Sequence, residues 1–309
     1  NFTYAPAQGW VYRGSFFGTF FNSEEVRPFN VLHEDNISAG MRHRFTLPVR
    51  DNGHITVGME YFNEDYGFST YETLEGGQTG SQITHEAESR NYLNAFLQTE
   101  WTFGEKWYLF AGLNTAFTNL SNEELKTNTP IAVFPTAGIS YSILSDLLVS
   151  GSVSRGYSSL ALEDVLNADG MINPDIVPET GWSEELSLKY FNDHGAFAKL
   201  TFFTMNIQNT VLTRRIMDDV FEKLNGGSSI HRGMEFEYKW ISASEKLSLD
   251  GAYTYSHFRF DEFVEGGVDH SGNQLPGTPR HHVYTRFNLS PWRKWDFHID
   301  YHLISSVYL

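Results

Sequence analysis

Residues 149–190 decide the fold class of this 309-residue chain; they read VSGSVSRGYSSLALEDVLNADGMINPDIVPETGWSEELSLKY. The segment that ends at Tyr157 and the segment that begins near Thr180 both alternate apolar and polar side chains, which predicts β-strands with one apolar face. The residues between them are acidic and contain Gly and Pro, as in a loop. The same order of strand, long loop and strand recurs through the chain.

The composition favours an all-β protein and excludes several other classes. Hydrophobic residues make up 40% of the chain and mean hydropathy is -0.36. No apolar run approaches the roughly 18 residues that a membrane-spanning helix needs, which excludes a helical membrane protein. The net charge of -16 would repel phosphate backbones, so nucleic acid is excluded as a partner. The absence of cysteine excludes disulfides and thiolate metal sites.

The alternation predicts about 13 antiparallel strands. The clearest is His231 to Trp240, and one of its faces is large and apolar with Met234, Phe236, Tyr238 and Trp240. The other face carries Gly233, Glu235, Glu237 and Lys239. The connections alternate between tight turns and long polar stretches, and we expect 71–88 to be one of the long loops.

This sorting of connections by length favours a transmembrane up-and-down β-barrel, which has short turns on one side and long loops on the other. Many strands exceed the roughly 9 to 11 residues that cross a bilayer at a tilt. Trp101, Trp107, Trp240, Trp292 and Trp295 flank the short turns, where an interfacial aromatic girdle would lie. Ordinary aromatic packing near hairpins is the alternative explanation of these tryptophans.

Four segments in the second half resemble boxes of the TonB-dependent outer-membrane transporter family. They are Ser154-Arg155-Gly156-Tyr157, then Asn173-Pro174 with Pro178-Glu179-Thr180 and Glu185, then Asn225-Gly226-Gly227 with Gly233 and Glu235, and finally Pro276, Pro279 and His281 of LPGTPRH. Each box is weak alone, but their order and spacing match the family. Ser158-Ser159-Leu160 departs from the family's usual Arg-Ala-Pro, and the boxes of haem-transporting members are not reproduced.

The resemblance implies that residues 1–309 belong to one outer-membrane barrel of about 22 strands, with the N-terminal plug and the last strands outside this chain. It implies energised import, with a ferric siderophore or another iron chelate as the first expectation for the ligand. The implied partners are outer-membrane lipid, the TonB-ExbB-ExbD energy-coupling complex acting through the plug, and a surface lipoprotein.

Three alternatives stay open at this point. A passive porin would share the strand pattern but would not need energy coupling. A soluble β-protein such as a propeller or an adhesin would show self-similar repeats, which the sequence lacks. An outer-membrane enzyme would need a catalytic constellation, and neither Gly-x-Ser-x-Gly nor His-Glu-x-x-His occurs, so we expect no enzyme.

Charged side chains on the polar faces of the strands are the remaining candidate site. The resemblance implies that they line the lumen and contact the plug, although plain solvation of the lumen explains them equally well. They are Arg42, Arg44, Glu60, Glu100, Glu237, Lys239, Arg286, His298, Asp300 and His302. Residues two apart on a strand lie about 7 Å apart, which is wide for one metal shell, so neither a metal nor a cofactor is expected.

Overall fold

The computed structural model describes residues 1–6, 9–122, 126–128, 131–158, 173, 176–217, 220–292 and 294–308. Within these ranges the chain is built almost entirely from β-strands, and thirteen of them have ten residues or more. The prediction of about 13 strands is therefore confirmed. The helical structure in these ranges is one short 3-10 turn, η1 (Glu75–Gly77), and no described helix is long and apolar enough to cross a membrane.

The chain divides into two compact units. Unit 1 comprises Asn1–Glu100 and Ala111–Pro135, and unit 2 comprises Trp101–Phe110 and Thr136–Leu309. The strands of unit 1 pair in chain order, with β7 on the edge of β6. They are β1 (Phe2–Tyr4), β2 (Val11–Val26), β3 (Val31–Val49), β4 (Gly53–Thr73), most of β5 (Thr79–Phe103) and of β6 (Trp107–Asn122), and β7 (Lys126–Asn128).

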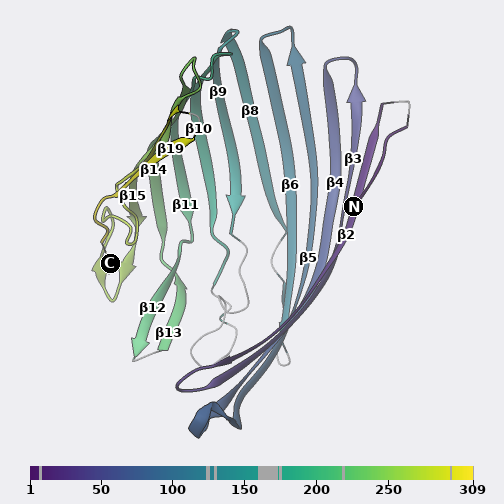
Figure 1. Cartoon of the computed structure of the whole chain (residues 1–309). Coiled ribbons are helices and arrows are strands. Elements are labelled where there is room, and N and C mark those ends of the chain that lie inside the picture. Colours follow the sequence, from purple (N-terminus) through teal and green to yellow (C-terminus); the bar gives the residue numbers. More distant parts are fainter. Residues whose placement is uncertain are drawn as a thin grey trace. The chain divides into compact units, whose positions relative to one another are not determined.

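The strands of unit 2 form an antiparallel sheet in the order β8, β9, β10, β11, β14, β15, β18 and β19. Two small hairpins stand outside this order, β12 with β13 and β16 with β17 (Figure 1). The strands are β8 (Ala132–Leu144), β9 (Leu147–Tyr157), β10 (Thr180–Phe191), β11 (Phe197–Gln208), β12 (Val211–Met217), β13 (Val220–Asn225), β14 (Ser228–Ile241), β15 (Leu247–Glu262), β16 (Val264–Glu265), β17 (Val268–Asp269), β18 (His281–Trp292) and β19 (Trp295–Ile304).

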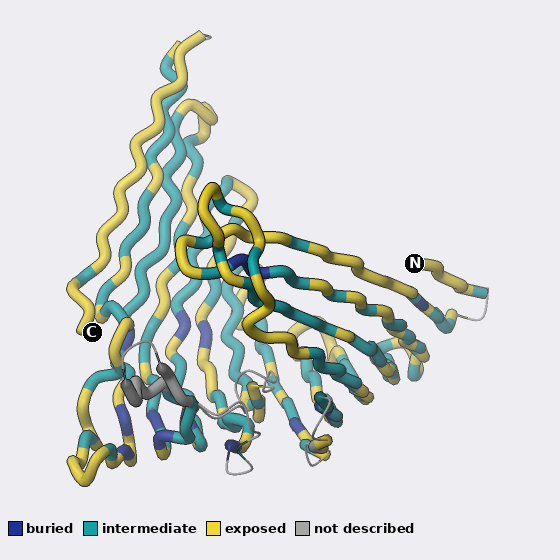
Figure 2. The backbone as a smooth tube through the Cα atoms, turned by 90° about the horizontal axis from the view of Figure 1, so that it is seen from below, coloured by how far each residue is buried: buried dark blue, intermediate teal, exposed yellow. Residues whose placement is uncertain are grey.

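Each unit leaves the apolar face of its sheet uncovered. Phe20 is 73% exposed in unit 1, and Leu186 and Ile299 are 55% and 62% exposed in unit 2. Exposed and half-buried residues alternate along the strands in Figure 2, as period-two strands require. Apolar patches of this extent are found on surfaces that meet a partner or lipid. The face that carries these residues is called the apolar face below, and the opposite one the polar face.

The prediction of a long loop at 71–88 is wrong. In unit 1, β4 continues to Thr73 and β5 begins at Thr79, so that only a tip with η1 separates them. Polar side chains pair across the two strands in this region: the hydroxyls of Thr70 and Thr84 lie 2.6 Å apart, and Ser69 Oγ lies 2.9 Å from His85 Nδ1. Cross-strand polar pairs let a sheet continue into water without an apolar face.

β11 and β12 follow each other closely in the sequence but are separate strands. Asn209 has a φ of 58°, which ends β11 and starts a separate hairpin made of β12 and β13. Asn adopts this left-handed region more readily than most residues. The long connections predicted for the remainder of unit 2 are found between β9 and β10, β11 and β14, and β15 and β18.

Candidate functional site

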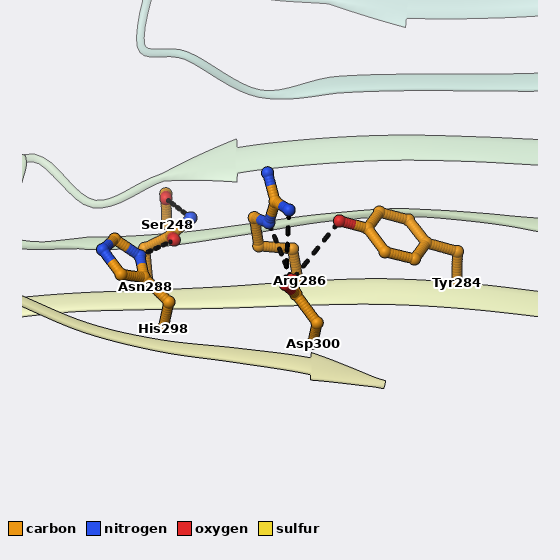
Figure 3. Close-up of polar contacts among 6 residues, drawn as sticks. All are labelled: Ser248, Tyr284, Arg286, Asn288, His298 and Asp300. Atoms are coloured by element: carbon orange, nitrogen blue, oxygen red, sulfur yellow. Dashed lines mark hydrogen bonds and ion pairs between the residues drawn. The ribbon is translucent and has the colours of Figure 1, made fainter. Parts of the chain in front are cut away.

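A row of alternating charges crosses the polar face of unit 2. Lys239, Asp250, Arg286 and Asp300 are register partners on four neighbouring strands, β14, β15, β18 and β19. Arg286 Nε donates to Asp300 Oδ1 at 2.7 Å and Nη2 donates to Oδ2 at 3.3 Å (Figure 3). A guanidinium that meets a carboxylate through two nitrogens fixes the orientation of both groups. The sequence-predicted residues Arg286, Asp300 and Lys239 are thus brought together.

A second row of neutral polar groups lies next to the first. Asn288 Nδ2 donates to Ser248 Oγ at 2.9 Å, and His298 Nδ1 lies 2.6 Å from Asn288 Oδ1, so His298 is the donor there (Figure 3). The two rows line a cavity of about 630 Å³. Its lining residues are Lys239, Ile241, Ser248, Asp250, Arg286, Asn288, His298 and Asp300. Such a lining suits a polar segment of protein or a hydrated solute.

His302 pairs with His282 near the loop end of the same face. Their Nε2 atoms lie 2.5 Å apart, which requires one ring to donate and the other to accept. Both side chains are exposed. No group of three or more His, Asp or Glu side chains placed to hold a metal ion occurs among the described residues.

The polar face of unit 1 carries ion pairs of the same kind. Arg42 and Glu60 are register partners and form a salt bridge. Glu64 accepts from Arg90 Nη2 at 2.5 Å and from Asn36 Nδ2 at 2.9 Å. These contacts tie β3, β4 and β5 together through side chains as well as through the backbone.

The other charged candidates are held differently. Arg44 lies opposite Arg13 on β2 and Gly58 on β4, and no ion pair joins it to the described part of the chain. Glu100 accepts from Gln98 Nε2 at 2.8 Å and lies 3.5 Å from His54 Nε2. Glu237 faces Lys199 in the register, and no contact within salt-bridge distance joins their side chains.

Two of the family-like boxes meet at the loop end of unit 2. The Asn225 side chain accepts from Val177 N at 2.9 Å and donates to Val177 O at 3.0 Å and to Asn209 O at 2.7 Å. Glu179 Oε1 accepts from Val211 N at 2.6 Å. Asn225 and Glu179 therefore connect the start of β10 to both ends of the β12–β13 hairpin. This set of contacts is called the loop clamp below.

Gly227 makes this close approach of loops feasible. Its φ is 83°, and a Cβ atom at this position would overlap the carbonyl oxygen of Glu262. Thr210 N donates to Gly227 O at 3.1 Å, and the Thr210 and Ser229 hydroxyls lie 3.2 Å apart in a buried environment. The Asn-Gly-Gly box is thus explained locally, since Asn225 bonds to the neighbouring loop and Gly227 permits the contact.

The other family-like residues are spread over the loop end and the strands of unit 2. Arg155, Gly156 and Tyr157 end β9, and Ser158 N donates to Glu179 O at 3.0 Å. Gly233 lies opposite Phe203, whose ring fills the space of the missing side chain. Glu185 and Glu235 lie on the polar face. The register partner of Glu185 on β11 is Phe203, and that of Glu235 is Thr201.

The last box lies where β18 begins. His281 Nδ1 lies 3.0 Å from the Tyr253 hydroxyl, and its backbone pairs with Ser305 at the end of β19. Pro276 and Pro279 precede β18, where a missing N–H costs no ladder bond. Asn173 is described but lies outside any strand, and Pro174 lies outside the described residues.

Several residues of these networks were missed by the sequence reasoning. Asp250 completes the charged row, and its position among the alternating Leu249 and Gly251 was the available signal. Glu64 lies four residues after Glu60, so period-two alternation places both on the polar face, and this was the available signal. Arg90 lies just after the stretch that was predicted as a loop, so its face could not be assigned. Asn225 was noticed only as part of a motif, because its partners are distant in the sequence.

A family model for "TonB dependent receptor-like, beta-barrel" matches residues 1–308. The chain belongs to the TonB-dependent receptor β-barrel family. It is accordingly a bacterial outer-membrane protein with strands that cross the membrane. No curated protein sequence matches it.

Solved structures of three outer-membrane receptors or transporters share the fold of this chain. The ferripyoverdine receptor of the outer membrane of Pseudomonas aeruginosa shares 12% identity, with a TM-score of 0.75 over 98% of this chain and 48% of its own. The alcaligin receptor FauA from Bordetella pertussis shares 13%, with a TM-score of 0.74 over 98% of this chain and 52% of its own. The ferric citrate transporter FecA shares 16% identity, with a TM-score of 0.75 over 96% of this chain and 46% of its own. The chain spans about half the length of these proteins.

Proposed function

We propose that this receptor barrel takes part in TonB-dependent import of a ferric siderophore or another iron chelate across the outer membrane. The observation that carries the proposal is the combination of an uncovered apolar face with a polar face of ordered charges. The first face fits lipid, and the second fits an aqueous lumen that is occupied by polar protein. The family and its siderophore and ferric citrate receptors favour iron chelates as the cargo.

In this proposal all 309 residues contribute to one barrel domain, and the plug is supplied by residues outside this chain. The polar-face pairs Arg42–Glu60 and Arg286–Asp300 would meet the plug, together with Lys239 and Asp250. Arg286 and Asp300 are each about half exposed. Ion pairs of such exposure contribute little stability, so a plug held by groups of this kind can be displaced by force from the TonB-ExbB-ExbD complex.

The loops of unit 2 would receive the ligand. The loop clamp joins the beginning of β10 to the β12–β13 hairpin, so that a contact made on one segment is transmitted to the other. No enzymatic step is involved in this function, because transport needs only binding and displacement.

The test measures transport by the full-length receptor in cells that lack other iron receptors. Radioactive iron would be supplied as ferric citrate or as ferric siderophores, in matched strains with and without TonB. We expect surface binding in both strains and uptake only in the strain with TonB. Uptake that does not need TonB and rises in proportion to the external concentration would instead identify a passive porin.

A further inference from the structure

Three basic side chains lie at the loop end of the apolar face of unit 2, and a fourth, that of Arg280, reaches toward them from the segment before β18. Arg232 on β14 and His257 on β15 are register partners, and Arg259 follows His257 on the same face. Arg259 donates to His257 Nε2. Arg280 Nη2 donates at 3.2 Å to Gln274 Oε1, and Gln274 in turn bridges to Arg259 through the backbone. Arg232, His257, Arg259 and Arg280 are called the basic cluster below.

The basic cluster lacks a counter-charge. His257 lies within electrostatic reach of all three arginines. No salt bridge joins Arg232, Arg259 or Arg280 to a carboxylate in the part of the chain that the structure describes. The chain as a whole carries a net charge of -16, so carboxylates are plentiful elsewhere. A cationic group assembled without acids in an acidic protein indicates that the compensating anion comes from outside.

The position of the basic cluster restricts what that anion can be. Toward the short turns, the same face of β14 continues with Met234, Phe236, Tyr238 and Trp240, and the same face of β15 with Tyr255 and Tyr253. These side chains form the lipid-facing band of a membrane barrel. Trp182, which is 45% exposed, lies on the apolar face of β10 at the level of Arg259, where aromatic residues mark a membrane interface.

We infer that the basic cluster binds the phosphate of a phosphorylated glycolipid in the outer leaflet of the membrane. Guanidinium groups match phosphate oxygens in charge and in geometry, and a ring of several arginines can surround one phosphate. The acyl chains of the same lipid would lie against the apolar band below the cluster. A free phosphate ion would have only the first of these two interactions. This inference does not depend on which ligand the receptor imports.

The acidic residue in the same cross-strand row as Arg232 lies too far away to neutralise the basic cluster. Glu184 on β10 shares the cross-strand row of Arg232 but is separated from it by Thr204 on β11. Neighbouring strands are about 4.8 Å apart, so the carboxylate lies about two strand spacings away and leaves the arginines open. Arg232, Arg259 and Arg280 are all exposed, as a site for a membrane lipid requires.

The experiment uses the full-length receptor in mixed detergent micelles. The apparent dissociation constant is measured for bisphosphorylated lipid A, for the same lipid A after removal of its phosphates, and for inorganic phosphate. The variant R232Q/R259Q/R280Q should bind bisphosphorylated lipid A roughly a hundredfold more weakly than the wild type, because each basic residue near a membrane surface contributes about a factor of five. Dephosphorylated lipid A should bind both proteins equally weakly.

The matched control removes three basic charges from the short-turn end with R50Q/K246Q/K294Q and should leave the affinity unchanged. Correct folding of each variant is checked by heat-dependent mobility in gels, and the single change Arg232→Gln is measured if the triple variant fails this check; it should weaken binding about fivefold. Equal affinity of the cluster variant and the wild type for bisphosphorylated lipid A would overturn the inference. So would equal affinity of the wild type for the two forms of lipid A. If inorganic phosphate, at the same concentration as bisphosphorylated lipid A, displaced this lipid from the receptor, the cluster would be a site for free anions and the inference would be overturned.

Discussion

The two units build their loop ends in opposite ways. In unit 1, β3, β4 and β5 have 19, 21 and 25 residues and end in short tips. In unit 2, β9, β10 and β11 have 11, 12 and 12 residues, and the connection from β11 to β14 contains the β12–β13 hairpin. The same antiparallel ladder is thus extended in one unit and replaced by folded loops in the other.

This difference shows which interactions stabilise the parts of each unit that extend beyond the membrane band. The extended strands of unit 1 keep their backbone ladder, and side chains such as Glu64 and Arg90 pair across it. The loops of unit 2 have lost that ladder and depend on a few side chains that bond to distant backbone groups, as Asn225 does. We therefore expect single substitutions to have large local effects in unit 2 and small ones in unit 1.

The largest effect is expected for Gly227→Val. A side chain there would overlap the Glu262 carbonyl in a left-handed backbone conformation, which should cost about 3 kcal/mol or more and release the β12–β13 hairpin. Limited proteolysis of the loop in the full-length receptor measures the release. Gly266→Ala is the control: Gly266 also has a positive φ, of 56°, but open space around it. Equal protease resistance of the wild type and the Gly227 variant would contradict the role of this glycine.

A smaller loss is expected for Asn225→Ala. The substitution removes three hydrogen bonds to Val177 and Asn209, each worth about 1 kcal/mol, so local stability should fall by about 2 to 3 kcal/mol. Hydrogen exchange of the Val177 amide reports the change directly. Asn206→Ala serves as the matched control, because Asn206 is exposed and has no side-chain hydrogen bond in the described structure. Unchanged protection of Val177 in the Asn225 variant would show that the loop clamp does not hold the loops.

In unit 1, Glu64→Gln should have a moderate effect. The two side chains of the Arg90 pair are 30% and 26% exposed, and the backbone ladder remains intact, so we expect a loss of about 1 kcal/mol. Urea unfolding of the full-length receptor measures it, and the exchanged pair E64R/R90E should recover most of the loss. A loss as large as that of Asn225→Ala would remove the contrast between the two units.

The smallest effect concerns the titration of two exposed carboxyls. Arg27, whose Nη2 lies 2.6 Å from Glu25, lowers the pKa of Glu25 at a tip of unit 1, whereas hydrogen bonds from Ser271 lower the pKa of Asp269 in a loop of unit 2. A lowered carboxyl pKa contributes stability at pH values above the unfolded-state pKa, and this is lost as pH falls through the folded-state pKa. Raising NaCl from about 0.05 M to about 0.5 M should move the Glu25 pKa back toward normal and leave that of Asp269 unchanged, because salt screens ion pairs more than neutral hydrogen bonds.

Carboxyl chemical shifts followed through an acid titration give both pKa values. Ser271→Ala should raise the pKa of Asp269, while Ser244→Ala, in a turn far along the chain, should not. If added salt moved both carboxyls equally, the distinction between the ion-paired tip and the hydrogen-bonded loop would be lost.

Local patterns in the sequence were sufficient to predict most of the strands and to assign their faces. Period-two alternation is a local property, so Met234, Glu235 and Phe236 could be assigned to faces without knowledge of any partner, and tight turns such as Asn192 to Gly195 follow from local backbone preferences. The family-like boxes could be recognised in the same way, because each is a short run of residues.

Which side chains meet, and where the backbone ladders end, depends on the tertiary structure. Polar residues from Tyr71 to Glu88 suit a loop or a water-exposed hairpin equally well, and the choice depends on the partner strand that Thr84 and His85 find. The charged row from Lys239 to Asp300 and the basic cluster around His257 both depend on strand register, because register places residues of separate strands next to one another. Because the energies of such groups depend on distances across strands, no local pattern along the chain could have specified them.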